Sequence, residues 1–153
     1  MAKHSPFLIE NLEEDSGFLM LQVSRLWVEY HEKVLRKHHG LSHIQYAVLA
    51  SIYWLVLDTC KQVTQTKLAK HTKIDPMTIS QMFKVLEKKG YIYRTAHESD
   101  IRAKSVNLTE EGKELITQAI ITITNADNKF FKVLGKNLKS FNKCMVELLN
   151  AND

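Results

Sequence analysis

The sequence predicts a mainly helical α+β fold in which one short β-hairpin accompanies several amphipathic helices. Apolar residues recur at helical spacing over most of the chain, whereas only residues 91–96 and 105–108 carry the β-branched, aromatic or alternating pattern of strands. The 153 residues include only five glycines and two prolines, and 44% are hydrophobic and 25% charged. This composition is typical of a folded helical domain and argues against a disordered chain.

The first helix is expected to begin near Ser16, a candidate N-cap, and to end before Gly40. Apolar side chains within this span recur every three or four residues and therefore share one face. Such a face belongs either to a core or to an interface. Its members are Leu19, Val23, Leu26, Trp27, Tyr30 and Val34.

The second helix has a clear start near His43. Ser42 and Gln45 have the spacing of a capping box, in which each side chain accepts a hydrogen bond from the backbone N–H of the other residue. Apolar residues then occupy most sides of the helix up to about Cys60. This pattern predicts a central helix enclosed by others.

Two shorter helices follow, joined by a very short turn. Thr64 is expected to cap the first, which ends near Thr72. Asp75 is expected to cap the second, because the following Pro76 fits the first helical position, where no N–H donor is needed. Gly90 can adopt the left-handed conformation that ends a helix. Helices joined so closely must cross at a steep angle.

The helix that starts at Pro76 has two different faces. One face carries apolar residues that can pack on the rest of the domain: Ile79, Met82, Phe83 and Leu86. The opposite face is free to contact another molecule and carries Met77, Thr78, Gln81, Lys84 and Lys88.

A hairpin with a charged tip is expected next, with strands at 91–96 and 105–108 and a polar segment at 97–104 between them. Residues 41–108 would then form a winged helix-turn-helix. This motif places its second helix in the major groove of DNA and its hairpin beside it.

After the hairpin, Thr109 is expected to cap a long helix that continues to Gly135, and residues 138–149 form a last amphipathic helix. One domain of this size offers little to cover such long apolar edges. We therefore expect residues 1–40 and 109–153 to form a helical dimerisation region in one compact chain. The expected assembly is a C2 homodimer held by the first and last helices.

The charge is concentrated in the centre of the chain. Residues 61–104 carry 10 basic and 4 acidic side chains, a net +6, whereas the whole chain has a formal net charge of +4. Positive charge on the element expected to read DNA favours binding to phosphates.

The order of several short motifs resembles the MarR family of bacterial transcriptional regulators. These are Leu68-Ala69, Thr78-Ile79-Ser80, the run from Leu86 to Ile92, Asp100-Ile101-Arg102, and Leu108-Thr109-Glu110-Glu111-Gly112. The resemblance implies a homodimer that binds a near-palindromic operator on double-stranded DNA and releases it when a small molecule or an oxidant arrives. It also implies that the apolar segment 6–9 joins the dimer interface.

We expect three groups of residues to contact DNA. Major-groove contacts are assigned to Met77, Thr78 and Gln81, with Gln81 suited to bidentate pairing with adenine. Contacts with the phosphate backbone are assigned to Lys67, Lys84, Lys88, Arg94 and Lys104. Arg102 at the hairpin tip is expected to enter the minor groove, oriented by Asp100, roles that the family resemblance also implies.

The resemblance further implies a pocket for a small aromatic or anionic effector between the first two helices and the DNA-reading region. Trp27, His31 and Tyr46 are the candidate lining residues. Zinc-sensing relatives need further ligands on the long helix after the wing. No histidine or cysteine occurs between Lys104 and Lys143 in this chain, so a metal site is not expected. The clustered histidines are expected to be solvated or in loops: His31, His38, His39 and His43.

The two cysteines, Cys60 and Cys144, suit a reducing cytoplasm. Peroxide-sensing MarR proteins keep a reactive cysteine where this chain has Ser16 and Gly17, so that sensor type is not expected. An alternative is a redox-responsive regulator that uses Cys144.

The sequence shows no Gly-rich phosphate loop, no nucleophile elbow and no paired metal motif, so an enzyme is not expected, nor is a cofactor. A winged helix that binds protein is a further alternative. No apolar run suits a membrane span or a signal peptide. The expected function is therefore that of a cytoplasmic, dimeric, sequence-specific DNA-binding regulator, a repressor released by an effector.

Overall fold

The computed structural model describes residues 11–59, 62–96 and 104–153. Its helices are α1 (Ser16–His39), α2 (His43–Thr59), α3 (Gln65–Thr72), α4 (Pro76–Lys88), α5 (Glu110–Phe130) and α6 (Leu138–Asn152). Two 3-10 segments, η1 (Leu12–Glu14) and η2 (Phe131–Asn137), precede α1 and α6. The strands are β1 (Val63–Thr64), β2 (Ile92–Ala96) and β3 (Lys104–Leu108).

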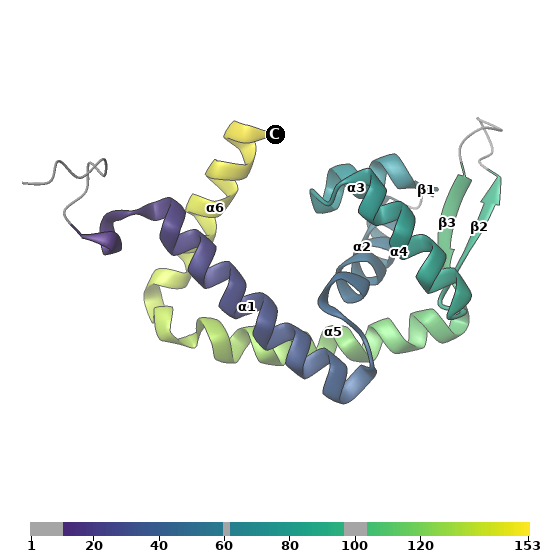
Figure 1. Cartoon of the computed structure of the whole chain (residues 1–153), viewed down its shortest axis with the longest axis horizontal. Helices are drawn as coiled ribbons and strands as arrows, with labels where there is room; N and C mark the ends of the chain where they lie inside the picture. Colours follow the sequence, from purple (N-terminus) through teal and green to yellow (C-terminus); the bar gives the residue numbers. More distant parts are fainter. Residues whose placement is uncertain (1–10, 60–61, 97–103) are drawn as a thin grey trace, which may run out of the picture.

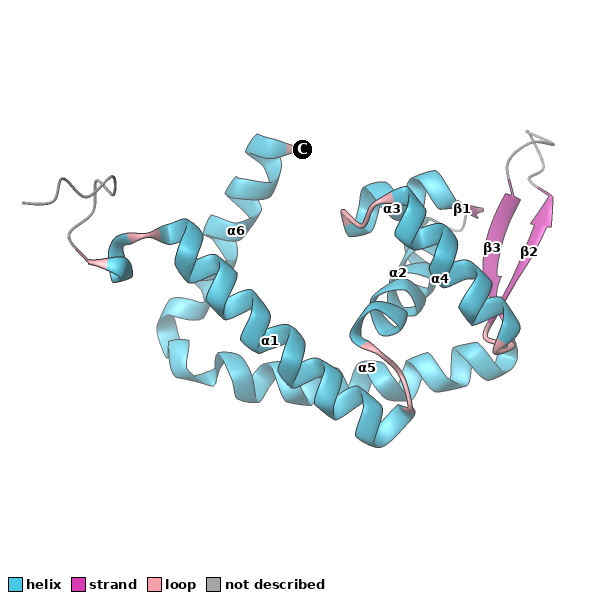
Figure 2. Cartoon of the chain, viewed as in Figure 1, coloured by secondary structure: helices cyan, strands magenta, loops and turns pink. Residues whose placement is uncertain are grey.

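The chain has two parts connected by α5 (Figure 1). One part, which we call the winged region, contains α2, α3, α4 and the three strands, and Figure 2 shows that every strand lies there. The other part, which we call the helical arm, contains α1, η2, α6 and the C-terminal half of α5. Helix α5 runs through both parts and packs against α1 in the arm and α2 in the winged region, so the two parts are joined along this helix.

The helix starts follow the predicted capping chemistry. In the capping box of α2, the Ser42 N–H lies 3.0 Å from Gln45 Oε1 and the Gln45 N–H lies 3.2 Å from Ser42 Oγ. Thr64, Asp75 and Thr109 cap α3, α4 and α5 as predicted. The prediction of Ser16 as the first cap is wrong: the side chain of Asp15 accepts the bond from the Phe18 N–H at 2.9 Å.

The hairpin is part of a three-stranded antiparallel sheet with the order β1-β3-β2. Residue Ile92 pairs with Leu108 at the base of the hairpin, and Ala96 pairs with Lys104 at the last described pair. Strand β1 was not predicted, because two residues are too short to show an alternating pattern. Its Val63 pairs with Val106, so β3 is the central strand and has a partner on each side.

The long helix predicted to reach Gly135 ends earlier, at Phe130. The 3-10 segment η2 follows, and within it Gly135 adopts φ +49° and ψ −123°. A residue with a side chain would be strained in that conformation, so glycine permits the chain to turn from α5 into α6.

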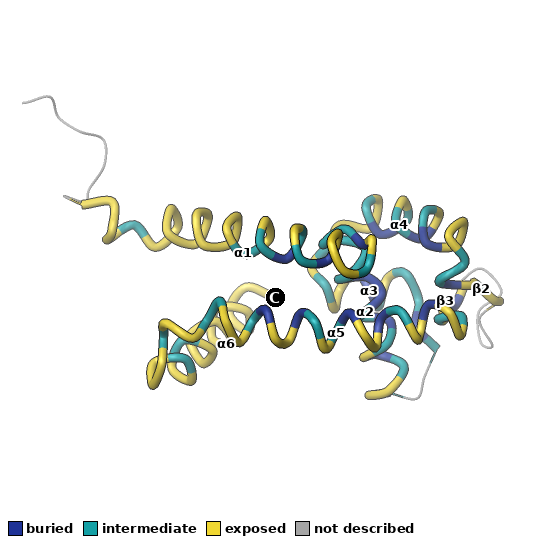
Figure 3. Tube along the Cα trace, turned by 90° about the horizontal axis from the view of Figure 1, so that it is seen from below, coloured by how far each residue is buried: buried dark blue, intermediate teal, exposed yellow. Residues whose placement is uncertain are grey.

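The core lies mainly in the winged region and along the α1–α5 contact. Its fully buried side chains include Phe83, Leu49 and Ile116. Figure 3 shows that buried residues are concentrated there, whereas the N-terminal half of α1 and nearly all of α6 are exposed. In the ranges that the structure describes, no single helix combines the length and apolarity of a membrane span, and α1 and α2 meet that test only together, across a bend of 79°.

Replacement of Phe83 by alanine is expected to lower the free energy of unfolding by about 3–5 kcal/mol, because it empties a core position on α4. Lys84→Ala, at the exposed neighbouring position, is the control and is expected to change stability by less than about 0.5 kcal/mol. Urea denaturation followed by circular dichroism measures both. Equal stabilities of the two variants would contradict the burial of Phe83.

Candidate nucleic-acid interface

Helix α4 buries one face and exposes the other, as the spacing of its residues predicts. Ile79, Phe83 and Leu86 are at most 1% exposed. On the opposite face Met77 is 72% exposed, and Gln81, Lys84 and Lys88 are also exposed. The structure therefore brings two of the three predicted base-reading residues, Met77 and Gln81, to one solvent-facing surface.

Thr78, the third of these residues, is already engaged at the start of the helix. Its backbone N–H donates to Asp75 Oδ1 at 2.9 Å, and its hydroxyl donates to Asp75 Oδ2 at 2.6 Å. These bonds lower the pKa of the Asp75 carboxyl. Thr78 is half-buried, so its first role is to organise the N-terminus of α4.

The position of α4 is set by α3. Gln65 Nε2 donates to the backbone oxygen of Pro76 at 3.0 Å, so the first turn of α3 holds the first turn of α4. Lys73 turns the chain between the two helices in the left-handed conformation, with φ +58°. Gln65 was not predicted as part of the site, because its partner is a backbone atom eleven residues away.

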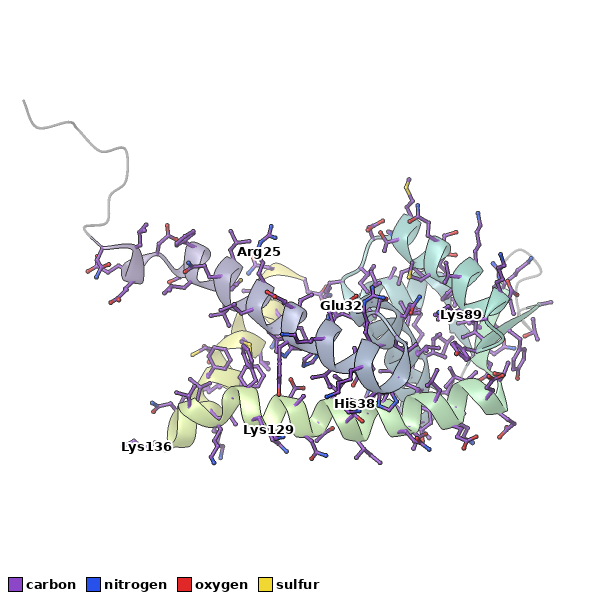
Figure 4. All side chains as sticks on the ribbon, turned by 60° about the horizontal axis from the view of Figure 1, so that its bottom comes forward. Arg25, Glu32, His38, Lys89, Lys129 and Lys136 are labelled. Atoms are coloured by element: carbon purple, nitrogen blue, oxygen red, sulfur yellow. The ribbon has the colours of Figure 1, made fainter. Side chains whose placement is uncertain are left out.

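The predicted phosphate-contacting lysines differ in their surroundings. Lys84, Lys88 and Lys104 are exposed. Lys67 is half-buried, and its ammonium donates to Thr59 Oγ1 at 3.0 Å. Figure 4 shows the neighbouring Lys89 on the winged region, far from Lys129 and Lys136 of the arm.

Arg94 is bound within the protein. Its Nη2 lies 2.7 Å from Glu87 Oε2, and the hydrogen bond lowers the pKa of the Glu87 carboxyl. This ion pair joins β2 to the last turn of α4, so it fixes the wing relative to the helix. The tip residues Asp100 and Arg102 lie outside the described residues.

A polar cluster occupies the contact between the arm and the winged region. Trp27 Nε1 donates to Asp127 Oδ1 at 2.8 Å, and His31 Nε2 lies 2.8 Å from the same oxygen. His43 of α2 adjoins both, with ring centroids 5.0 Å from Trp27 and 5.4 Å from His31. Two of the three predicted effector-site residues therefore converge on one carboxylate.

The prediction that the histidines are solvated is wrong for His31, which is only 1% exposed. His39 is half-buried, and its Nε2 lies 2.7 Å from Thr122 Oγ1. Asp127 was missed by the sequence analysis. The signal was a lone carboxylate next to the apolar stripe of α5, four residues after Ile123.

Burial and charge shift several pKa values in this cluster. Burial alone would raise the pKa of Asp127, but the hydrogen bonds from His31 and Trp27 outweigh burial and lower it. Burial lowers the pKa of His43, and the neighbouring His31 lowers it further. Burial, together with the charge of Asp127, raises the pKa of Tyr46 to about 12. Tyr46 is therefore linked to the carboxylate electrostatically.

The arm carries an apolar groove of about 530 Å³ between α1, η2 and α6, lined chiefly by apolar side chains including Leu19, Phe141 and Leu148. Cys144 is exposed and lines this groove, whereas Cys60 lies outside the described residues. Among the residues that the structure describes, no three His, Cys, Asp or Glu side chains are arranged to hold a metal ion.

Comparisons with known proteins agree with this architecture. The model of the MarR family matches residues 41–104. The uncharacterized HTH-type transcriptional regulator YdcH of Bacillus subtilis is 33% identical over 149 residues, which cover 97% of this chain and 98% of YdcH. The HTH-type transcriptional regulator SarZ of Staphylococcus epidermidis is 26% identical over 139 residues, covering 83% of this chain and 90% of SarZ.

Solved structures show the same fold. CouR from Rhodococcus jostii RHA1, bound to p-coumaroyl-CoA, matches with a TM-score of 0.78 at 26% identity and covers 95% of this chain and 98% of CouR. The C80S mutant of MarR from E. coli, complexed with operator DNA, matches with a TM-score of 0.78 at 20% identity, covering 91% of this chain and 96% of that chain. The winged helix-turn-helix fold with N- and C-terminal helices is thereby confirmed.

The depressed pKa of His43 predicts that acid destabilises the protein. The unfolded chain takes up a proton near pH 6.5, before the folded chain does, so the stability from neutral His43 is present above about pH 6.5 and is lost as pH falls toward the lower folded pKa. Urea denaturation at several pH values between about 7.5 and 5.5 should show a smaller decline for His43→Gln than for the wild type.

His38→Gln, at an exposed position, is the matched control and should decline like the wild type. A His43→Gln variant with the same pH dependence as the wild type would refute the assignment to His43.

Proposed function

This chain belongs to the MarR family of transcriptional regulators, and we propose that it acts as a dimeric repressor that binds a near-palindromic operator and leaves it when a small molecule binds. The family consists of DNA-binding regulators and not of enzymes. The observation that carries the proposal is the outer face of α4. The helix is capped by Asp75 and packs its inner face on the core, and Met77 and Gln81 on the outer face are exposed.

This face matches the chemistry of major-groove recognition. Recognition helices contact base edges with residues near their N-termini, which on α4 are Met77, Thr78 and Gln81. The Gln81 amide can donate and accept at once and suits adenine. Lys84, Lys88 and Lys104 are exposed around it and supply contacts to phosphates. Lys67 contributes once its ammonium leaves Thr59. Arg94 contributes while it stays paired with Glu87, because a guanidinium has five N–H donors.

The wing is the second contact. Arg102, oriented by Asp100, is assigned to the minor groove beside the site of α4. A guanidinium is attracted most strongly to the minor groove of an A·T-rich sequence, because that groove is narrow and has a deeper negative potential. The ion pair between Arg94 and Glu87 supports this assignment, because it holds the wing in register with α4.

Dimerisation is proposed for the helical arm. Leu26 and Met20 on α1 and Leu148 and Leu149 on α6 are all more than half exposed, although they are apolar. Met20 and Leu148 also line the apolar groove between α1 and α6, and exposed apolar side chains gathered in this way mark an interface. A second copy of the chain would cover it in an isologous C2 contact and present two α4 helices to one duplex.

The effector is proposed to act at the cluster around Asp127. CouR is bound to p-coumaroyl-CoA in its structure, and we propose a small aromatic or anionic effector for this chain. Trp27, His31 and Tyr46 would contact it. Because Asp127 already accepts from Trp27 and His31, an anionic ligand must displace that carboxylate and thereby loosen α5 from α1.

The function is tested with duplex DNA selected by the protein from a random pool. Gln81→Ala should weaken binding to the selected duplex by about 1–3 kcal/mol, the usual value of one good base contact. Gln118→Ala, an exposed glutamine on α5, is the control and should bind like the wild type. Gel-shift titration at fixed salt measures both. Equal affinities of the two variants would remove Gln81 from base recognition.

The dimer is tested by sedimentation velocity at micromolar concentration. The wild type should sediment as a dimer, and Leu148→Glu should shift it to the monomer, because a buried unpaired charge opposes association. Leu57→Glu is a control of similar exposure on the winged region, 60% against 52% for Leu148. A wild-type monomer, or a dimer that survives Leu148→Glu, would contradict the proposed interface.

A further inference from the structure

The end of α4 and the start of α5 meet in one compact joint at the base of the wing. Gly90 ends α4 with φ +78°, and the Tyr91 N–H returns to the Leu86 oxygen at 3.0 Å. The chain then makes the hairpin and comes back to the same place at Thr109. Two segments nineteen residues apart in sequence are thus in direct contact.

Thr109 makes three hydrogen bonds in this joint. Its hydroxyl donates to the backbone oxygen of Gly90 at 2.6 Å and accepts from the Gly112 N–H at 3.0 Å. Its backbone N–H donates to the Tyr91 oxygen at 3.1 Å. One side chain therefore caps α5 and, at the same time, ties that cap to the residue that ends α4.

Gly112 allows the two helix ends to approach so closely. A Cβ atom placed on Gly112 would lie 2.0 Å from the backbone oxygen of Tyr91 and 2.8 Å from its carbonyl carbon. Because the clash is with backbone, no side-chain rotation can relieve it. The joint is thus a direct backbone-to-backbone contact.

From the joint, α5 continues as one helix to the cluster in which Asp127 binds Trp27 and His31 of α1. The contact at Thr109 therefore ties the C-terminal end of α4 to the helix that reaches the arm. A helix of 13 residues such as α4 is roughly 20 Å long, so a tilt of about 5° at its C-terminal end moves its N-terminal end by roughly 1.7 Å. The residues assigned to base contacts lie at that moving end.

We infer that Thr109 is a positioning residue for DNA recognition: its hydroxyl holds the C-terminal end of α4 on α5 and so sets where Gln81 meets the bases. The inference rests on the proposed function of α4. Thr109 itself need not contact DNA. Base recognition demands placement within about 0.5 Å, whereas phosphate contacts by long lysine side chains tolerate a shift. Loss of the clamp should therefore reduce sequence discrimination more than overall DNA affinity.

The test separates the two hydrogen bonds of the Thr109 hydroxyl: the cap, accepted from the Gly112 N–H, and the clamp, donated to the Gly90 oxygen. Thr109→Ser keeps both hydrogen bonds of the hydroxyl. Thr109→Asp keeps the cap, because a carboxylate accepts from the Gly112 N–H, but it cannot donate to the Gly90 oxygen. The matched control is Thr117→Val, since the Thr117 hydroxyl is also on α5 but donates to the backbone oxygen of Lys113 within the same helix.

The measured quantity is the ratio of affinities for a selected duplex and for a scrambled duplex of the same composition, at one salt concentration. This ratio cancels the general effect of the added charge. Circular dichroism first establishes a temperature at which every variant is folded. We expect Thr109→Asp to lower the ratio at least tenfold, and Thr109→Ser and Thr117→Val to stay within twofold of the wild type.

Gly112→Ala is a second test of the same contact. Its methyl group pushes the start of α5 away from the Tyr91 backbone while Thr109 stays intact, so it should lower the affinity ratio as Thr109→Asp does. The inference is overturned if either folded variant keeps the wild-type ratio, or if Thr109→Ser loses it. A wild-type protein that shows no preference for any selected duplex would instead overturn the proposed function, so the two failures are distinguishable.

Discussion

The structure depends on one continuous buried stripe along α5. Gly112, Ile116, Ala119, Ile123 and Ala126 are all buried, at alternating spacings of four and three residues. The N-terminal part of this stripe meets the winged region, and the C-terminal part meets α1. Because one helix serves both contacts, the proposed DNA-contacting face of α4 and the arm cannot move independently unless α5 bends or slides. This constraint gives the chain a route by which an event in the arm can reach α4.

Polar groups are placed where the two ends of this helix meet their partners. At the start, Thr109 connects α5 to the backbone that ends α4. Near the other end, Asp127 accepts from Trp27 and His31 of α1. Apolar burial is not directional and tolerates small slides, whereas hydrogen bonds specify one relative position. The energy of the fold therefore comes mainly from apolar burial, whereas the geometry of the proposed DNA contact depends on these few polar contacts.

The winged region was predictable in detail because its signals are local. Capping by Ser42, Thr64, Asp75 and Thr109, with a stop at Gly90, involves partners within a few residues, so spacing alone is informative. The same spacing correctly separated the buried and exposed faces of α4. Errors occurred where local signals compete or are too short, as with Asp15 in place of Ser16 and the two-residue strand β1.

The sequence by itself determined which segments are helices, where they are capped, and which central element carries the positive charge and the family motifs. Only the tertiary structure decided that His31 is buried, that Asp127 is its partner, that Arg94 is bound to Glu87, and that Gln65 holds Pro76. The physical reason is distance along the chain. A cap or an amphipathic face is specified by residues within one or two helical turns of each other. His31 and Asp127 lie 96 residues apart, and their contact exists only once α1 and α5 have packed.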